Sequence, residues 1–215
     1  MKVMIIGQGG HSKVLYDLIT TNKEMEVVGY LDDKYHYFTR EDDLYVGPVS
    51  SAEKITEYFE DIKYIIGIGD NHVRKKIVEK LQVPEEKFIS LIHPSALVSP
   101  SARIGHGSVI LPFSIVNAGS EIGNHTIVNT RSIVEHDCIL EDFVHVSPNA
   151  TVTGTVEIEE GAHIGASATI IPNIHIGAWS KIGAGASVIS DVPKYSTVVG
   201  IPAKLKMKEG DKLVQ

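Results

Sequence analysis

The sequence of 215 residues has little cysteine, no excess of positive charge and no long apolar run near its start. With Cys138 as the one cysteine, a disulfide within the chain is excluded, and we expect this thiol to be buried rather than catalytic. The net charge of −7 and the lack of basic blocks argue against nucleic acid or an anionic membrane as a partner. The apolar residues 3–6 are too few for a signal peptide or a membrane span, which predicts a cytoplasmic protein.

A regular repeat occupies the second half of the chain. From Val98 to Val188 every sixth residue is aliphatic, which makes sixteen consecutive hexapeptides. The residue two positions earlier is small, except where it is Val144, Val156 or Ile174. A period of six fits neither an α-helix nor a hairpin meander, whereas it is typical of a parallel β-helix whose hexapeptides form the flat sides of a prism. Three sides close one coil, so residues 18 apart should stack in columns with a spacing of about 4.8 Å.

The residues before the repeat read as a separate nucleotide-binding unit. Alternating strands and helices predict a small parallel, Rossmann-like sheet. We expect strands at residues 2–6, 26–31 and 64–68, helices at residues 13–20, 52–59 and 73–81, and an irregular excursion at residues 35–51. His93-Pro94 marks a boundary. The predicted domains are therefore the nucleotide-binding unit at 1–93, the β-helix at 94–204 and a C-terminal tail at 205–215.

A glycine-rich turn follows the first predicted strand, with the sequence Gly7-Gln8-Gly9-Gly10-His11-Ser12. It has the form of a phosphate-binding loop, although Ser12 stands where the dinucleotide fingerprint has its third glycine. Ligands of parallel sheets bind beyond the carboxyl ends of the strands. The residues that fall there are Gly9, Gly10, His11, Asp32 and Gly69. A tight turn without a ligand is the alternative interpretation of the loop.

Two histidines interrupt the repeat. His136 lies at a predicted corner of the prism, and His145 should point outward from a flat side. Because His145, His163 and Lys181 are 18 apart, they should form one outward ladder, which could follow an anionic coenzyme. The alternative is that three surface polar residues share a column by chance.

Motifs along almost the whole chain resemble those of the hexapeptide-repeat acyltransferases that acetylate nucleotide-activated amino sugars. They are the segment 129–154 with its Glu-His-Asp-Cys core, the glycine-rich turn, Leu31-Asp32-Asp33, Ile68-Gly69-Asp70-Asn71, Asp191-Val192-Pro193 and residues 200–204. The UDP-4-amino-sugar N-acetyltransferases of the bacillosamine pathway are the most similar, with the sialic-acid O-acetyltransferases as near relatives. The resemblance implies a left-handed β-helix and a homotrimer with acetyl-CoA bound between chains. It implies no metal, and the histidine spacing does not fit a trimer-interface zinc site.

The resemblance also implies roles for individual residues. His136 matches the general base, and Asp137 matches the acidic neighbour that raises its basicity. His145 matches a residue that contacts the thioester region of acetyl-CoA. Further matches are Gly154, Ala166 and Ala184 along the coenzyme, and Gly9, Gly10, His11, Asp32, Asp33, Gly69 and Asn129 in the nucleotide-sugar pocket.

The chemistry of acetyl transfer agrees with these roles. An amine that attacks a thioester must lose a proton, and one histidine held by a carboxylate is sufficient for that step. His145 or a backbone N–H could stabilise the negative charge on the carbonyl oxygen. The sequence thus predicts an acetyl-CoA-dependent N-acetyltransferase of a UDP-linked amino sugar, for surface polysaccharide or glycan assembly. O-acetylation of sialic acid or another sugar, and an inactive nucleotide-sugar-binding scaffold, are the alternatives.

The spacing of the two histidines bears on how such a site is assembled. His136 and His145 are nine residues apart, which is half of an 18-residue coil. They should therefore lie on opposite parts of the prism, where they cannot easily face one ligand. If both contact the thioester, we expect them to come from neighbouring chains of the trimer.

Overall fold

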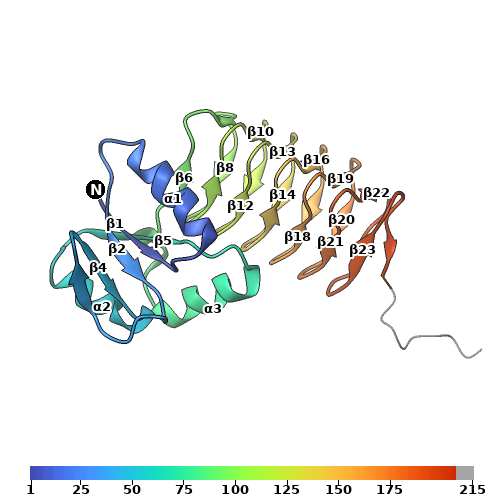
Figure 1. The fold of residues 1–215 in the computed structure, drawn as a ribbon. Helices are drawn as coiled ribbons and strands as arrows, with labels where there is room; N and C mark the ends of the chain where they lie inside the picture. The colour runs from blue at the N-terminus through green and yellow to red at the C-terminus, as the bar shows by residue number, and fades with distance from the viewer. Residues whose placement is uncertain (207–215) are drawn as a thin grey trace, which may run out of the picture.

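The computed structural model describes residues 1–206 and consists of an α/β unit joined to a prism of parallel coils (Figure 1). Of the predicted tail at 205–215, residues 207–215 lie outside the described part. Leu205 ends strand β24 (Lys204–Leu205), which pairs antiparallel with β23 (Thr197–Val199). The last two strands therefore belong to the prism.

The α/β unit is built on a five-stranded sheet with the order β3-β4-β2-β1-β5. Its strands are β1 (Lys2–Ile6), β2 (Glu26–Leu31), β3 (Thr39–Glu41), β4 (Leu44–Gly47) and β5 (Ile62–Ile66). Its helices are α1 (Gly10–Thr20), α2 (Ala52–Thr56) and α3 (Asn71–Leu81), with short 3₁₀ turns at Val49–Ser51 and Glu85–Lys87. The apolar runs of β1, β2 and β5 are buried, as expected for strands covered on both faces. The predicted parallel sheet is confirmed.

The prediction of an irregular excursion at residues 35–51 was wrong in part. This segment contains the hairpin β3–β4, and β4 pairs in parallel with β2. Asp42 adopts a left-handed φ of 51° at the turn. All three residues of β3 are exposed, so this edge strand carries no apolar alternation from which the sequence could have predicted it.

The prism has three sides, each a sheet of parallel strands one coil apart, except that β24 closes the third side as an antiparallel strand. The first side holds β7 (Leu97–Val98), β10 (Ile115–Val116), β13 (Ile133–Val134), β16 (Thr151–Val152), β19 (Thr169–Ile170) and β22 (Ser187–Val188). The second holds β8 (Arg103–Ile104), β11 (Glu121–Ile122), β14 (Ile139–Leu140), β17 (Glu157–Ile158) and β20 (His175–Ile176). The third holds β6 (Leu91–Ile92), β9 (Val109–Ile110), β12 (Ile127–Val128), β15 (His145–Val146), β18 (His163–Ile164), β21 (Lys181–Ile182), β23 and β24.

The sixteen predicted hexapeptides match the strands β7 to β22, and each ends in the predicted aliphatic residue. These side chains fill the axis of a left-handed β-helix. Cys138 is fully buried among them, as predicted, and so are the larger exceptions Val144 and Val156. The first corner of a coil joins the first and second sides, the second corner joins the second and third, and the third corner returns to the first side.

The two parts of the chain share a core. Strand β6 pairs with β9, so the coils begin at Leu91, ahead of the start predicted at residue 94. Leu91, Val109 and Leu111 pack in one buried cluster with Val3 and other residues of the α/β unit. Helix α3 lies against the second corner of the coils (Figure 1). Within residues 1–206 there is no helix of the length and apolarity needed to cross a membrane.

Candidate functional site

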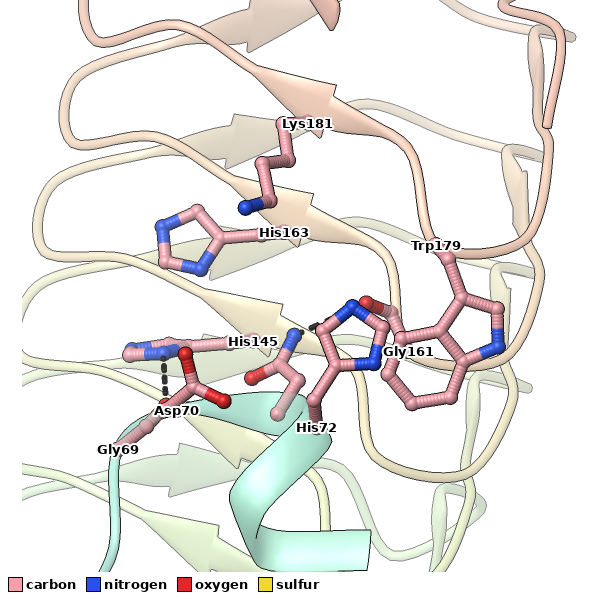
Figure 2. Close-up of a pocket in the computed structure, with 9 residues that line it drawn as sticks. Gly69, Asp70, His72, His145, Gly161, His163, Trp179 and Lys181 are labelled. Carbon is pink, nitrogen blue, oxygen red and sulfur yellow. Dashed lines mark hydrogen bonds between the residues drawn. The ribbon is translucent and has the colours of Figure 1, made fainter. Parts of the chain in front are cut away.

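A pocket of about 440 Å³ lies where the N-terminus of α3 meets the third side of the prism. Figure 2 shows the side chains that converge on it from the two parts of the chain. Its lining consists of Gly69, Asp70, Asn71, His72, His145, Gly161, His163, Trp179 and Lys181. Of the predicted site residues, only Gly69 and His145 line this pocket.

His145 is held by one hydrogen bond on each side of its ring. The Asn129 amide lies with Nδ2 3.0 Å from His145 Nε2, and the Gly69 carbonyl oxygen lies 3.3 Å from Nδ1. The backbone N–H of Thr130 donates to Asn129 Oδ1 at 2.8 Å, which assigns the NH₂ group of this amide to the histidine. Nε2 is therefore the acceptor, and Nδ1 carries the proton that it donates to Gly69.

The surroundings of His145 keep the ring neutral. Burial, followed by the nearby His163, Arg74 and His11, lowers the pKa of His145 to about 3. A neutral imidazole with a fixed tautomer can offer one N–H to a ligand without bringing a charge into the pocket. This is the property required of a donor to a developing oxyanion.

The predicted ladder is formed. His145 pairs in register with His163, and His163 with Lys181, along the third side (Figure 2). His163 Nε2 lies 3.1 Å from Ser147 Oγ, and burial followed by Lys181 lowers its pKa. The ladder points away from the prism axis, but α3 and the preceding loop cover its beginning. His145 thus lies between the two parts of the chain rather than on an open side.

The far wall of the pocket was missed by the sequence reasoning. His72 of α3 stacks on Trp179 of the second corner, with ring centroids 4.1 Å apart and planes at 16°. A Cβ on Gly161 would lie 2.4 Å from the Trp179 ring, so only glycine leaves room for it. The column rule contained a signal for this wall, because Phe143, Gly161 and Trp179 are each 18 residues apart.

The glycines predicted to bind the nucleotide are free of packing constraints. A Cβ at Gly9, Gly10 or Gly69 would meet nothing within 4 Å, and none of the three has a positive φ. Neither sterics nor backbone conformation therefore demands glycine at these positions. Close approach of a ligand to the backbone is a physical reason for glycine there. Gly10 also begins α1, whose first N–H groups form an anion-binding end.

The other residues predicted for the sugar-nucleotide pocket have distinct environments. His11 is mostly buried beside this loop, its Nε2 has no partner among the described residues, and burial together with Arg74 lowers its pKa to about 4. Asp32 accepts the N–H of Gln8 at 2.7 Å and so supports the glycine loop. Asp33 points elsewhere: it accepts from Val49 N at 2.9 Å and from Lys80 Nζ at 2.8 Å, and this pairing with Lys80 lowers its pKa. The structure does not bring Asp33 to the pocket.

His136 and Asp137 form a pair at the first corner, far around the prism from His145. His136 Nδ1 lies 2.9 Å from Asp137 Oδ2, and both side chains are well exposed. A Cβ on Gly154 would lie 2.6 Å from the His136 ring, and one on Gly119 would lie 2.6 Å from Asp137 Oδ1. Two glycines in the adjacent coils therefore make the room in which this pair sits. Asp137 itself has a left-handed φ of 57°.

The residues predicted along the coenzyme occupy two corners. Gly154 lies at the first corner with His136, whereas Ala166 and Ala184 are exposed at the third corner. The N–H of Gly185 donates to Ala166 O at 2.8 Å, which stacks these two turns directly. One chain does not gather Gly154, Ala166 and His145 around a single point.

Comparison with known proteins identifies the relatives of this fold. The perosamine N-acetyltransferase from Caulobacter crescentus, solved with CoA and GDP-perosamine as a variant with one histidine replaced by asparagine, has a TM-score of 0.87 and 33% identity, covering 97% of this chain and 98% of that one. The chain belongs to the family of hexapeptide-repeat sugar N-acetyltransferases. The acetyltransferase domain of PglB from Neisseria gonorrhoeae, solved with acetyl coenzyme A, has a TM-score of 0.82 and 35% identity over 95% of this chain and 98% of that one.

Family models and a curated relative agree with this assignment. Residues 2–81 match the PglD N-terminal domain, and residues 155–190 match the bacterial transferase hexapeptide model of six repeats. A UDP-N-acetylbacillosamine N-acetyltransferase from Bacillus subtilis (strain 168) is 43% identical over 109 residues. That match spans about half of each protein, 51% of this chain and 50% of the relative.

Proposed function

We propose that the protein is an acetyl-CoA-dependent N-acetyltransferase of a UDP-linked amino sugar, with a 4-amino group as the acceptor, and that it works in the cytoplasm. The observation that carries the proposal is the His136–Asp137 pair beside Gly154, in a chain that is alike over nearly its whole length to sugar N-acetyltransferases. The choice of UDP rests on the curated relative, which is named for a UDP-linked substrate.

The reaction is a direct transfer. The free amine of the sugar attacks the thioester carbonyl, a C–N bond forms, and the tetrahedral intermediate collapses with loss of the CoA thiolate. His136 accepts the proton that the nitrogen loses, and its bond to Asp137 orients the ring for this role. His145 donates its Nδ1–H to the oxyanion in a bond that the thioester oxygen shares with the Gly69 carbonyl, which lies 3.3 Å from Nδ1. No covalent intermediate on the protein is needed.

The site is assembled from two chains of a trimer. His145 faces out from the third side, whereas His136 lies at the opposite corner of the same prism. The first corner of a neighbouring chain, docked beside the third side, would place its His136 and Gly154 opposite His145. Gly9, Gly10, His11, Asp32 and Asn129 then belong to the chain that supplies His145, and hold the nucleotide sugar. A three-fold ring repeats this contact three times.

The test is a thiol-release assay with acetyl-CoA and three acceptors: a UDP-linked 4-amino sugar, its GDP-linked counterpart and free sialic acid. Release of CoA with the UDP-linked sugar supports the proposal. Release with the GDP-linked sugar alone would correct the nucleotide, and release with sialic acid alone would establish O-acetylation. Binding without any release would identify an inactive scaffold. Light scattering tests the trimer, which a monomer at micromolar concentration would contradict.

A further inference from the structure

Arg74 is a charged residue buried in the middle of the molecule. Its side chain is 1% exposed, and burial lowers its pKa to about 9. All five guanidinium N–H groups donate hydrogen bonds, and all five acceptors are uncharged. Buried cations are usually paired with a carboxylate, because desolvation of a lone charge costs several kcal/mol. Among the described residues Arg74 has no carboxylate in direct contact, and the charge of the nearby Asp70 only partly offsets the lowering of its pKa by burial, so its five hydrogen bonds need an explanation beyond packing.

The five acceptors belong to both parts of the chain. Nε donates to His125 O at 2.7 Å and Nη2 to Phe143 O at 2.9 Å, both on the second corner of the prism. Nη1 donates to Ile68 O and Gly69 O, each at 3.1 Å, in the loop that follows β5. The last bond goes to Asn71 Oδ1 at 2.9 Å. Arg74 therefore fixes the 68–71 loop against the coils.

The Gly69 carbonyl connects this cation to His145. The same oxygen accepts from Arg74 Nη1 at 3.1 Å and lies 3.3 Å from His145 Nδ1. We propose that Arg74 is a positioning residue: it holds the Gly69 carbonyl against Nδ1 and so acts together with the Asn129 amide at Nε2 to fix His145 as the neutral, Nδ1-protonated tautomer. The importance of this tautomer for catalysis rests on the proposed function, but the contact itself does not.

The charge of Arg74 and its hydrogen bonds both favour the neutral form of His145. The groups that face His145 are His163 on β18, His11 on α1 and Arg74 on α3, and the two histidines are themselves neutral because burial lowers their pKa. Asp70 and Lys181 act on His163 with opposite signs. Arg74 is the fixed cation among the neighbours of His145, and its removal should make protonation of that ring easier.

The test compares Arg74→Met with the wild-type protein by NMR of ¹⁵N-labelled histidine rings, from about pH 5 to pH 8, where an ordinary histidine titrates. The His145 signals are assigned with a His145→Gln variant. We expect wild-type His145 to stay neutral and protonated at Nδ1 across the range. In Arg74→Met the Gly69 carbonyl is no longer held against Nδ1, so part of the rings should populate the Nε2–H tautomer. An unchanged His145 spectrum in folded Arg74→Met would overturn the proposal.

Two further variants separate positioning from general loosening. Lys75→Met breaks another contact between the two parts of the chain, the 2.6 Å ion pair with Glu160, and should leave the His145 signals unchanged. Arg74→Lys keeps the charge but cannot reach five acceptors, so mixed tautomers are expected. If Arg74→Met does not fold, this variant decides: a retained single Nδ1–H form refutes the proposal. A protein without acetyltransferase activity would refute the proposed function and leave this result standing.

Discussion

The composite site makes a quantitative prediction for mixtures of two inactive variants. His136→Ala and His145→Ala each destroy one half of the proposed site, and each should be inactive as a pure trimer. In an equal mixture, a site is intact when a His145→Ala chain supplies His136 and its neighbour, a His136→Ala chain, supplies His145. Each condition holds for half of the positions, so about one quarter of the sites are restored. The mixture should regain about a quarter of the wild-type rate.

The assay is thiol release after the two unfolded variants are refolded together. The unfractionated mixture should show about a quarter of the wild-type rate, and mixed trimers purified by two affinity tags should show about a third, because each has one restored site in three. The matched control mixes His136→Ala with Asp137→Ala. These residues share one corner of one chain, 2.9 Å apart, so no assortment of chains restores both to one site. We expect activity above that of both parents in the first mixture, and none above that of the parents in the second. Mixed trimers that stay inactive in the first case would disprove the composite site and leave His145 with another role.

Four other predictions concern single sites. His136→Ala should lower kcat by about 10²–10⁴, the usual contribution of a positioned base, with little change in KM for acetyl-CoA; near-normal turnover would make His136 an ordinary surface residue. Gly154→Ala should also lower kcat, because its Cβ would lie 2.6 Å from the His136 ring, while the free energy of unfolding stays nearly constant. Asp32→Ala removes the acceptor for the Gln8 N–H and should raise KM for the nucleotide sugar alone; an equal rise for acetyl-CoA would contradict this. His125 is buried, and its pKa falls from 6.5 to about 4 on folding. The unfolded chain therefore binds the proton more readily, and stability is lost as the pH falls from 6.5 towards 4, by about 3 kcal/mol. Urea denaturation of His125→Phe should show a smaller acid loss than wild type, and an equal loss would assign it to other groups.

The periodic part of the fold could be predicted from sequence almost residue by residue. Strands β7 to β22 follow the aliphatic period because each coil repeats the same inward contact. The local sequence pattern is therefore sufficient to predict how the strands stack. The hairpin β3–β4 could not be predicted in this way. Its edge strand β3 is exposed, and β4 joins the sheet by pairing with β2, which ends at Leu31, well before β4 begins at Leu44. Whether a segment pairs as an edge strand depends on its neighbours in the sheet rather than on its own sequence.

The candidate site was predictable only where its residues share a local motif. The contact of His136 with Asp137 joins neighbours in sequence, and the ladder of His145 follows from the 18-residue coil. The stack of His72 on Trp179 joins two domains, so neither segment alone carries its signature. The same holds for Arg74, which as one arginine in an amphipathic helix looks like a solvated residue until the coils are packed against it.

The backbone conformation of Asp137 lowers the stability of the protein at a residue with a proposed role in catalysis. A left-handed conformation, φ 57° here, costs a non-glycine residue about 1 kcal/mol or more, and the preceding coil has Gly119 at the same place in the column. Thr155 and Asn173, in the same column of the next two coils, adopt the same left-handed φ of 58° and 61°, so this is the regular conformation of the corner, and glycine at 137 would avoid its cost. If the aspartate orients His136, Asp137→Gly should raise the resistance to urea while lowering turnover. The corner would then be a point where natural selection has kept a less stable protein because it is a faster enzyme.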